Sequence, residues 1–131
     1  MAFEDCVSLR SIDLPYGLTS IGYAAFMDCH SLTSITLPES LSGLGGFMGE
    51  VFANCTSLTS VTFPRSFTST GFGTFGGCTS LVDVTIPDTI TTIGASTFSD
   101  CTSLTNITLP SSITAIGEDA FSGCTSLSQL S

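Results

Sequence analysis

A single period runs through the whole sequence. Its six cysteines stand at positions 6, 29, 55, 78, 101 and 124, so successive cysteines are 23, 26, 23, 23 and 23 residues apart. A fixed period of roughly 20–50 residues is the signature of a solenoid, whose coils bury a shared core by stacking. The spacing therefore predicts 23-residue coils. Phenylalanine stands three residues before every cysteine and leucine three residues after it, at Phe3, Phe26, Phe52, Phe75, Phe98 and Phe121 and at Leu9, Leu32, Leu58, Leu81, Leu104 and Leu127.

Each coil also contains a strand signal and a turn signal. Residues 104–109 follow the spacing Leu-x-x-Ile-x-Leu, which contains the apolar–polar alternation of a short strand. Pro110 ends the strand because proline cannot donate to a ladder. All five prolines stand at this place in their coils. The stretch before the cysteine, such as residues 119–124, is too short for a stable helix and predicts a helical or 3₁₀ turn opposite the strand. Thr70 alone interrupts the apolar columns.

Length and charge limit what such an array can be and bind. We expect residues 1–131 to form a single solenoid of about five and a half coils. The chain has 11 acidic and 2 basic residues, a formal net charge of −9. Nucleic acids and anionic lipid surfaces require clustered Lys and Arg, so this charge disfavours both as partners.

No segment of the sequence is expected to insert into a membrane. No apolar run approaches the roughly 18 to 20 residues that span a bilayer. The chain begins Met-Ala-Phe-Glu-Asp, with acids where a signal peptide carries basic residues. The sequence thus indicates either an intracellular chain or one whose targeting segment was removed or never included.

The residue pattern predicts no catalytic or metal centre. A zinc site needs four converging ligands, whereas these cysteines lie along a line one coil apart. Parallel side chains in register also point the wrong way for an unstrained disulfide, so we predict a buried, reduced cysteine ladder. His30 beside Cys29 suggests a Cys/His nucleophile, but the His30 column is an exposed turn position while Cys29 is expected to face the core. We therefore predict a protein that is not an enzyme and has no cofactor.

The strand side of the coils is the predicted interaction surface. Its outward positions form columns rich in hydroxyl groups, which suit many weak polar contacts, partly through water, with an extended partner. The regular threonine spacing is also compatible with ice binding, although a curved face fits ice poorly. The candidate partner-binding residues on this strand face are Arg10, Asp13, Thr33, Thr36, Thr59, Thr62, Asp83, Thr85, Thr105, Asn106 and Thr108.

The one 26-residue interval contains about three inserted residues, within 45–50. Extra residues in a tightly wound coil must loop outwards, which would place two large apolar side chains on a glycine-rich bulge. The following coil adds an arginine and a phenylalanine where sister coils have other residues. We predict a second partner-binding patch here, formed by Phe47, Met48, Arg65 and Phe72; the alternative is local repacking over the core.

The columns, written LxxIxLPxxLxxIGxxAFxxCxx, resemble the BspA-like (treponemal-type) leucine-rich repeat. The resemblance covers nearly the whole chain and implies a right-handed parallel β-solenoid whose strands line a concave face. It also implies binding of proteins and surfaces rather than catalysis, and an extracellular or cell-surface location. The chain opens inside a coil and ends just after Leu130 without polar caps, which predicts a fragment of a larger array or a subunit whose ends are covered.

Two functions remain open from the sequence. The first is a binding module that holds a protein or glycoprotein on its strand face. The second is a structural or linker subunit that docks into a multi-subunit complex through its insertion and its uncapped ends. Flanking sequence would discriminate between them, because a signal peptide and further coils favour the adhesive module.

Overall fold

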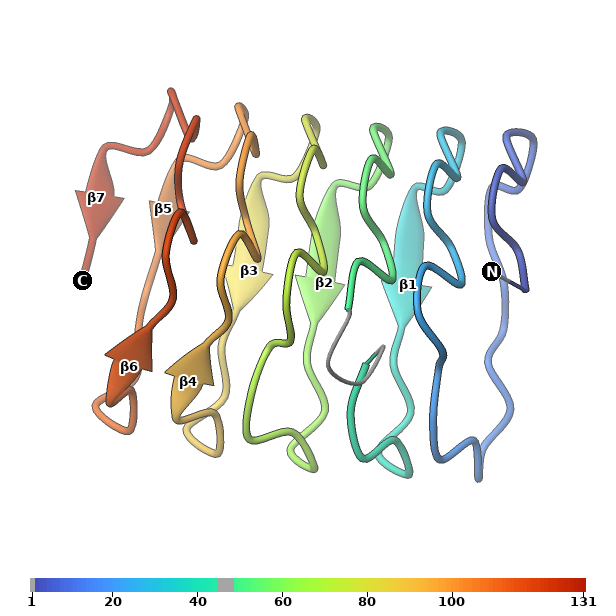
Figure 1. Cartoon of the computed structure of the whole chain (residues 1–131), viewed down its shortest axis with the longest axis horizontal. Helices are drawn as coiled ribbons and strands as arrows, with labels where there is room; N and C mark the ends of the chain where they lie inside the picture. The colour runs from blue at the N-terminus through green and yellow to red at the C-terminus, as the bar shows by residue number, and fades with distance from the viewer. Residues whose placement is uncertain (1, 45–48) are drawn as a thin grey trace.

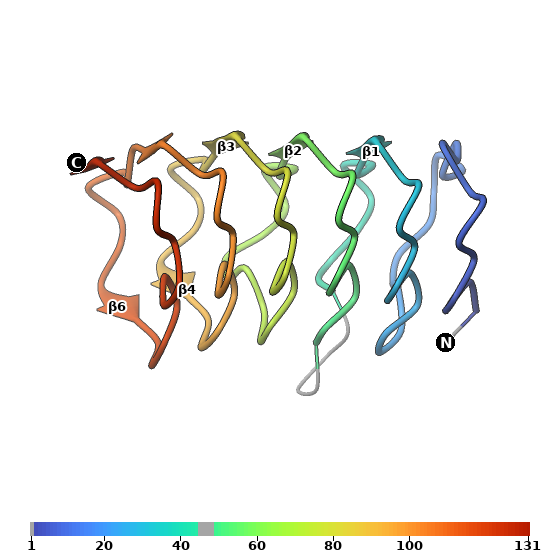
Figure 2. The same ribbon diagram turned by 90° about the horizontal axis from the view of Figure 1, so that it is seen from above.

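The structure is a computed structural model that describes residues 2–44 and 49–131. The chain winds through a row of similar coils, with its two termini at opposite ends of the row (Figure 1). Seen from above, the strands β1, β2 and β3 follow one another along one side of the row (Figure 2). The predicted repeat solenoid is confirmed. The described strands are β1 (Ser34–Thr36), β2 (Ser60–Thr62), β3 (Asp83–Thr85), β4 (Thr92–Ile93), β5 (Asn106–Ile107), β6 (Ala115–Ile116) and β7 (Gln129–Leu130).

The strands pair in parallel with their equivalents in the next coil. In the three-stranded sheet β1-β2-β3, Ile35 lies opposite Val61, and Val61 opposite Val84. A bridge from Thr85 to Thr108 and the β5–β7 pair extend the same line of strands. The β4–β6 pair forms a second parallel line elsewhere on the coil. The 26-residue interval separates β1 from β2 without shifting their register.

Hydrogen-bonded turns replace the predicted helical or 3₁₀ turns in the described residues. In the coil that precedes Cys29, backbone N–H groups alternate between two kinds of acceptor. Phe26 and Asp28 donate to the next coil, at Val51 and Ala53, whereas the intervening Met27 donates back within its own turn. Two positions in the turn, held here by Ala24 and Asp28, have positive φ. Left-handed residues at both places interrupt any 3₁₀ run.

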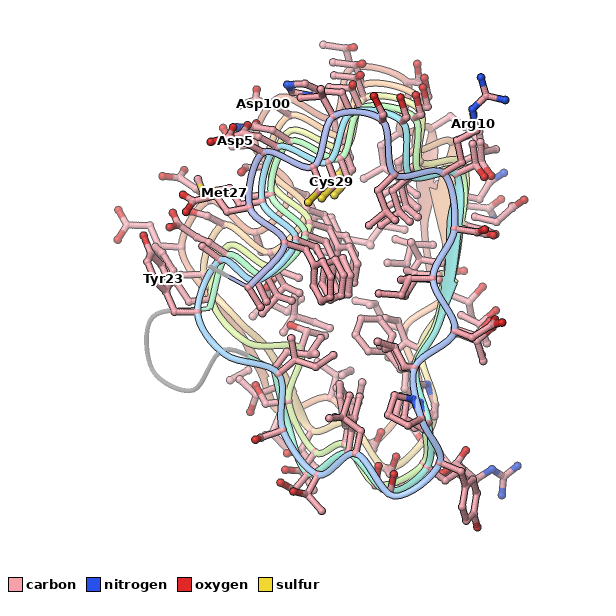
Figure 3. The ribbon with its side chains drawn as sticks, turned by 90° about the vertical axis from the view of Figure 1, so that its right-hand side faces the viewer. Asp5, Arg10, Tyr23, Met27, Cys29 and Asp100 are labelled. Atoms are coloured by element: carbon pink, nitrogen blue, oxygen red, sulfur yellow. The ribbon has the colours of Figure 1, made fainter. Side chains whose placement is uncertain are left out.

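The core consists of the columns that the period predicts. Phe26, Phe52, Phe75 and Phe98 are fully buried, and neighbouring rings stack with centroids 5.3–5.9 Å apart and planes within 7° of each other. The cysteine sulfurs point into this core beside the rings (Figure 3). All six cysteines are free thiols; the inner four are buried and the two at the ends half-buried. Each phenylalanine and cysteine thus packs against its equivalents in adjacent coils.

Thr70, the one polar residue in the apolar columns, is buried without being unsatisfied. Its hydroxyl accepts a hydrogen bond from the Gly94 N–H at 2.9 Å and lies 3.0 Å from the hydroxyl of Thr97. Thr97 in turn donates to the Gly71 carbonyl at 2.7 Å. A buried hydroxyl is tolerated only when it is hydrogen-bonded. Thr70 and Thr97, in adjacent coils, therefore provide hydrogen-bond partners for each other's buried hydroxyls.

Glycine at position 94 is required by the close approach of two coils. A methyl group added there would collide with the Gly71 backbone carbonyl, whereas one added to the equivalent Gly22 would have no described residue within 4 Å. We expect Gly94→Ala to lower the free energy of unfolding by about 1–3 kcal/mol through overpacking. Gly22→Ala should be neutral or stabilising by up to about 1 kcal/mol. Urea denaturation of both variants checks this, and equal losses would contradict the packing argument.

Candidate functional site

Cys29 and His30 do not form a nucleophile–base pair. The Cys29 thiol donates to the Phe3 carbonyl at 3.1 Å, and His30 Nδ1 lies 3.0 Å from the Asn54 carbonyl. Burial raises the pKa of the Cys29 thiol, which suppresses the reactive thiolate. In residues 2–44 and 49–131, no group of three or more His, Cys, Asp or Glu side chains is placed to hold a metal ion. The described segments also contain no helix with the length and apolarity needed to cross a membrane.

The strand face is hollowed along its length. A hollow of about 630 Å³, the N-terminal groove, is lined by residues 11–14, 16, 34–39 and 62–64 of three successive coils. A second hollow of about 540 Å³, the C-terminal groove, is lined by residues on and beside β3 and β5. Seven of the eleven predicted strand-face residues line one of them: Asp13, Thr36 and Thr62 line the N-terminal groove, and Asp83, Thr85, Asn106 and Thr108 the C-terminal groove.

The threonine columns on this face differ in their hydrogen bonds. Thr33 Oγ1 donates to the Arg10 carbonyl and Thr59 Oγ1 to the Thr33 carbonyl, each at 3.3 Å. These hydroxyls brace one coil against the preceding one. Within the described part of the chain, no hydrogen bond engages the hydroxyls of Thr36, Thr62 or Thr85. The column that lines the grooves therefore keeps its hydroxyls available to a ligand.

Tyr16 and Glu39 are groove residues that the sequence pattern does not single out. Tyr16 follows Pro15, lines the N-terminal groove and is 93% exposed. The equivalent positions after the other four prolines are Glu39, Arg65, Asp88 and Ser111. The only signal in the sequence is that one coil carries a large aromatic side chain where its sister coils carry polar ones. An exposed tyrosine beside a groove is a residue type that dominates interface energies.

Charge is distributed unevenly around the coil. The turn side, opposite the strands, carries seven of the eleven carboxylates: Glu4, Asp5, Asp28, Glu50, Asp100, Glu118 and Asp119. Viewed along the solenoid axis, Asp5 and Asp100 lie at the same corner of the turn side, whereas Arg10 projects from the strand side (Figure 3). The hydrogen bond with Glu50 raises the pKa of the Tyr23 hydroxyl. The two faces therefore present different chemistry to a partner.

A small hollow of about 260 Å³, the turn-side furrow, also lies on the turn side. Its lining includes Gly73, Gly76 and Gly77 together with Glu50, Phe72 and Asp100. Phe72 is 43% exposed.

Sequence comparison identifies the repeat family. A family model described as BspA type leucine rich repeat region matches residues 1–128, in six copies. The chain belongs to the BspA-type leucine-rich repeat family. No curated protein matches it. BspA-type repeats are repeat modules of a class that typically mediates protein–protein interaction and is typically non-catalytic.

Solved structures of bacterial leucine-rich repeat proteins share the fold. A cell surface protein of Faecalibacterium prausnitzii is 36% identical, with a TM-score of 0.86 over 92% of this chain and 31% of that one. The T. pallidum leucine rich repeat protein is 32% identical, with a TM-score of 0.80 over 93% of this chain and 55% of that one. A Bacteroides ovatus repeat protein is 33% identical, with a TM-score of 0.75 over 87% and 29%. The BspA-type array spans only part of each relative.

Of the four residues in the predicted insertion patch, Arg65 and Phe72 are described in this BspA-type array, and these two do not lie together. Phe47 and Met48 lie outside the described residues. Arg65 follows Pro64 on the strand side, where its N–H donates to Glu39 Oε2 at 3.0 Å. Phe72 instead lines the turn-side furrow. Arg65 and Phe72 therefore belong to different surfaces, because the chain turns a corner of the coil between them.

The two end coils of the BspA-type array expose apolar side chains. Phe3 is partly exposed at one end, and Ile116 and Leu130 are about half exposed at the other. These residues belong to the same columns that are buried in inner coils.

Proposed function

We propose that this chain is a non-catalytic module that binds a protein or glycoprotein on its strand face. The observation that supports the proposal is the pair of grooves along that face, lined in part by the hydroxyls of Thr36, Thr62 and Thr85, which no other described residue engages. Concave sites lined largely by apolar groups with a few convergent polar groups are typical of ligand binding. An extended partner lying across the strands would meet equivalent contacts in each coil.

Cell-surface location is part of this proposal. It is supported by the solved relative from Faecalibacterium prausnitzii, which is described as a cell surface protein. An adhesive role requires a partner outside the cell. The acidic, hydroxyl-rich surface of this chain would contact such a partner in an aqueous environment.

A random peptide library tests the strand-face assignment. Peptides selected on the wild-type protein should bind about tenfold or more weakly to the double variant Thr62→Tyr/Thr85→Tyr, which fills both grooves with residues that suit a strand. The matched control, Ser122→Tyr/Thr125→Tyr, adds the same bulk at exposed positions away from the strands. Selected peptides that bind both double variants equally well would refute the strand face as the site.

A structural subunit is the second candidate, favoured by the apolar side chains of the end coils. Stacking of these ends on another coil would bury Phe3, Ile116 and Leu130. Sedimentation of the wild type and of Ile116→Lys/Leu130→Lys distinguishes this role. Association that disappears in the variant supports docking through the ends, and a concentration-independent monomer contradicts it.

A further inference from the structure

We propose that the N-terminal groove receives an arginine side chain of an extended protein segment, held by the ring of Tyr16 and the carboxylates of Asp13 and Glu39. This inference rests on the proposed function, because it names the partner chemistry of the same face. It concerns the first three coils only.

The charge of the groove selects the sign of the ligand. Its lining includes two carboxylates, of Asp13 and Glu39, and no Lys, Arg or His side chain. The whole chain carries a net charge of −9, so an acidic segment would be repelled during approach and a basic one attracted. A cation that enters the groove meets these two carboxylates. The basic residue Arg65 lies beside the lining, one residue after Pro64, with its backbone N–H bonded to Glu39 Oε2.

The aromatic ring at the margin selects the shape of the cation. Tyr16 is almost wholly exposed, so its ring faces are available for a cation–π contact. A guanidinium group stacks on aromatic rings and binds a carboxylate through two parallel hydrogen bonds, which an ammonium cannot do. The combination of an exposed ring and carboxylates in one groove therefore favours arginine over lysine.

Glu39 is already positioned for this role. The Arg65 backbone N–H donates to Glu39 Oε2 at 3.0 Å, which holds the carboxylate at the groove margin and leaves Oε1 for a ligand. A side chain that is held before binding loses less conformational entropy when it binds. The hydroxyls of Thr36 and Thr62 line the same groove and can bond to the backbone of the bound segment.

The size of the groove fits an extended segment. Three coils span two inter-strand distances, roughly 10 Å at about 4.8 Å each. An extended chain rises about 3.3 Å per residue, so about three residues cross the groove, enough for one central arginine and its neighbours.

The turn-side furrow is the competing site for a basic segment. It also combines an aromatic ring, Phe72, with two carboxylates, of Glu50 and Asp100. The furrow is less than half as large as the N-terminal groove, and Glu50 is already hydrogen-bonded to the Tyr23 hydroxyl. These differences favour the strand side and provide a control with the same chemistry.

The test uses random twelve-residue peptides displayed on phage and selected on the wild-type protein. We expect arginine to be enriched in the selected pool. The strongest peptide is then synthesised with its arginine and with citrulline, the neutral isostere, and the two affinities are compared by fluorescence polarisation. The citrulline form should bind wild type about tenfold or more weakly.

Two matched triple variants locate the arginine. Tyr16→Ala/Asp13→Asn/Glu39→Gln should reduce the difference between the arginine and citrulline peptides to roughly twofold or less. Phe72→Ala/Glu50→Gln/Asp100→Asn removes the same groups from the turn-side furrow and should leave the tenfold difference intact. Thermal melting of each variant confirms that it is folded before its affinities are compared.

The outcomes separate this inference from the proposed function. A pool without arginine that still fails to bind Thr62→Tyr/Thr85→Tyr overturns the inference and leaves the strand face as the site. Dependence on Tyr16 without dependence on charge points to a neutral ligand, such as a glycan, and also overturns it. An arginine preference that is lost only in the turn-side variant overturns the inference in favour of the furrow. Peptides that bind Thr62→Tyr/Thr85→Tyr unchanged overturn both.

Discussion

Ile107→Asp is expected to unfold the array at room temperature. Ile107 is 2% exposed and lies in β5, opposite Leu130 of β7. An aspartate there would place an unpaired carboxylate in the core, at a cost of several kcal/mol. That is a large part of the 5–15 kcal/mol or so that stabilises a typical domain. Circular dichroism in the absence of denaturant checks the prediction, since the variant should have lost the strand signal.

Thr108→Asp is the matched control for this substitution. Thr108 is the next residue along the chain, is exposed and lines the C-terminal groove. The same aspartate there should cost less than about 1 kcal/mol, because the carboxylate stays in water. If Thr108→Asp proved as damaging as Ile107→Asp, the assignment of inward and outward faces would be wrong.

The buried thiols are expected to react only when the chain opens. Burial raises the pKa of Cys55 and Cys101 to about 12 and that of Cys78 well above its ordinary value. Because the thiolate is the nucleophile, iodoacetamide at neutral pH should label these three at least about 100-fold more slowly in the native protein than in guanidinium chloride. The half-buried Cys6 should be labelled first. Peptide mass mapping over time measures the order.

The same thiols predict a loss of stability in alkali. An ordinary cysteine ionises near pH 9, whereas folded Cys55 and Cys101 resist ionisation until about pH 12. Their contribution is fully present below about pH 9 and is lost as the pH rises towards 12, because only the unfolded chain releases its protons in that window. The urea midpoint should therefore fall between pH 8 and pH 10.5. Cys55→Ala/Cys101→Ala should show a smaller fall, and an equal fall would assign the effect to other groups.

The period in the sequence predicted the fold because each column repeats the same burial. Phe52, Cys55 and Leu58 are buried as their spacing requires, and so are their equivalents in the inner coils. Even Thr70, the one exception, is buried, since its hydroxyl found a partner in Gly94 of the next coil. Columns predict which residues face inwards, but they do not predict hydrogen bonds between columns.

The turns and the groove could not be predicted to the same degree. Positive φ occurs at Ala24, Glu50 and Ser96. None of these is a glycine, the residue type that usually predicts a left-handed turn. Ladder bonds to the next coil maintain this conformation, and they are long-range contacts. Tyr16 stands in a column whose residues vary in every coil, so no period identifies it. The groove exists only once three coils are stacked.

A groove that crosses three coils has a mechanical consequence for the array. In the part of the chain that the structure describes, adjacent coils contact each other through stacked rings such as Phe26 on Phe52 and through thiol-to-carbonyl bonds such as Cys55 to Phe26. The stability of the stack along its axis therefore comes from the interfaces between adjacent coils. A segment bound across the N-terminal groove would contact three coils and so link two inter-coil interfaces at once. Occupancy would then stiffen the stack beneath it and leave the flexibility of the remaining coils unchanged.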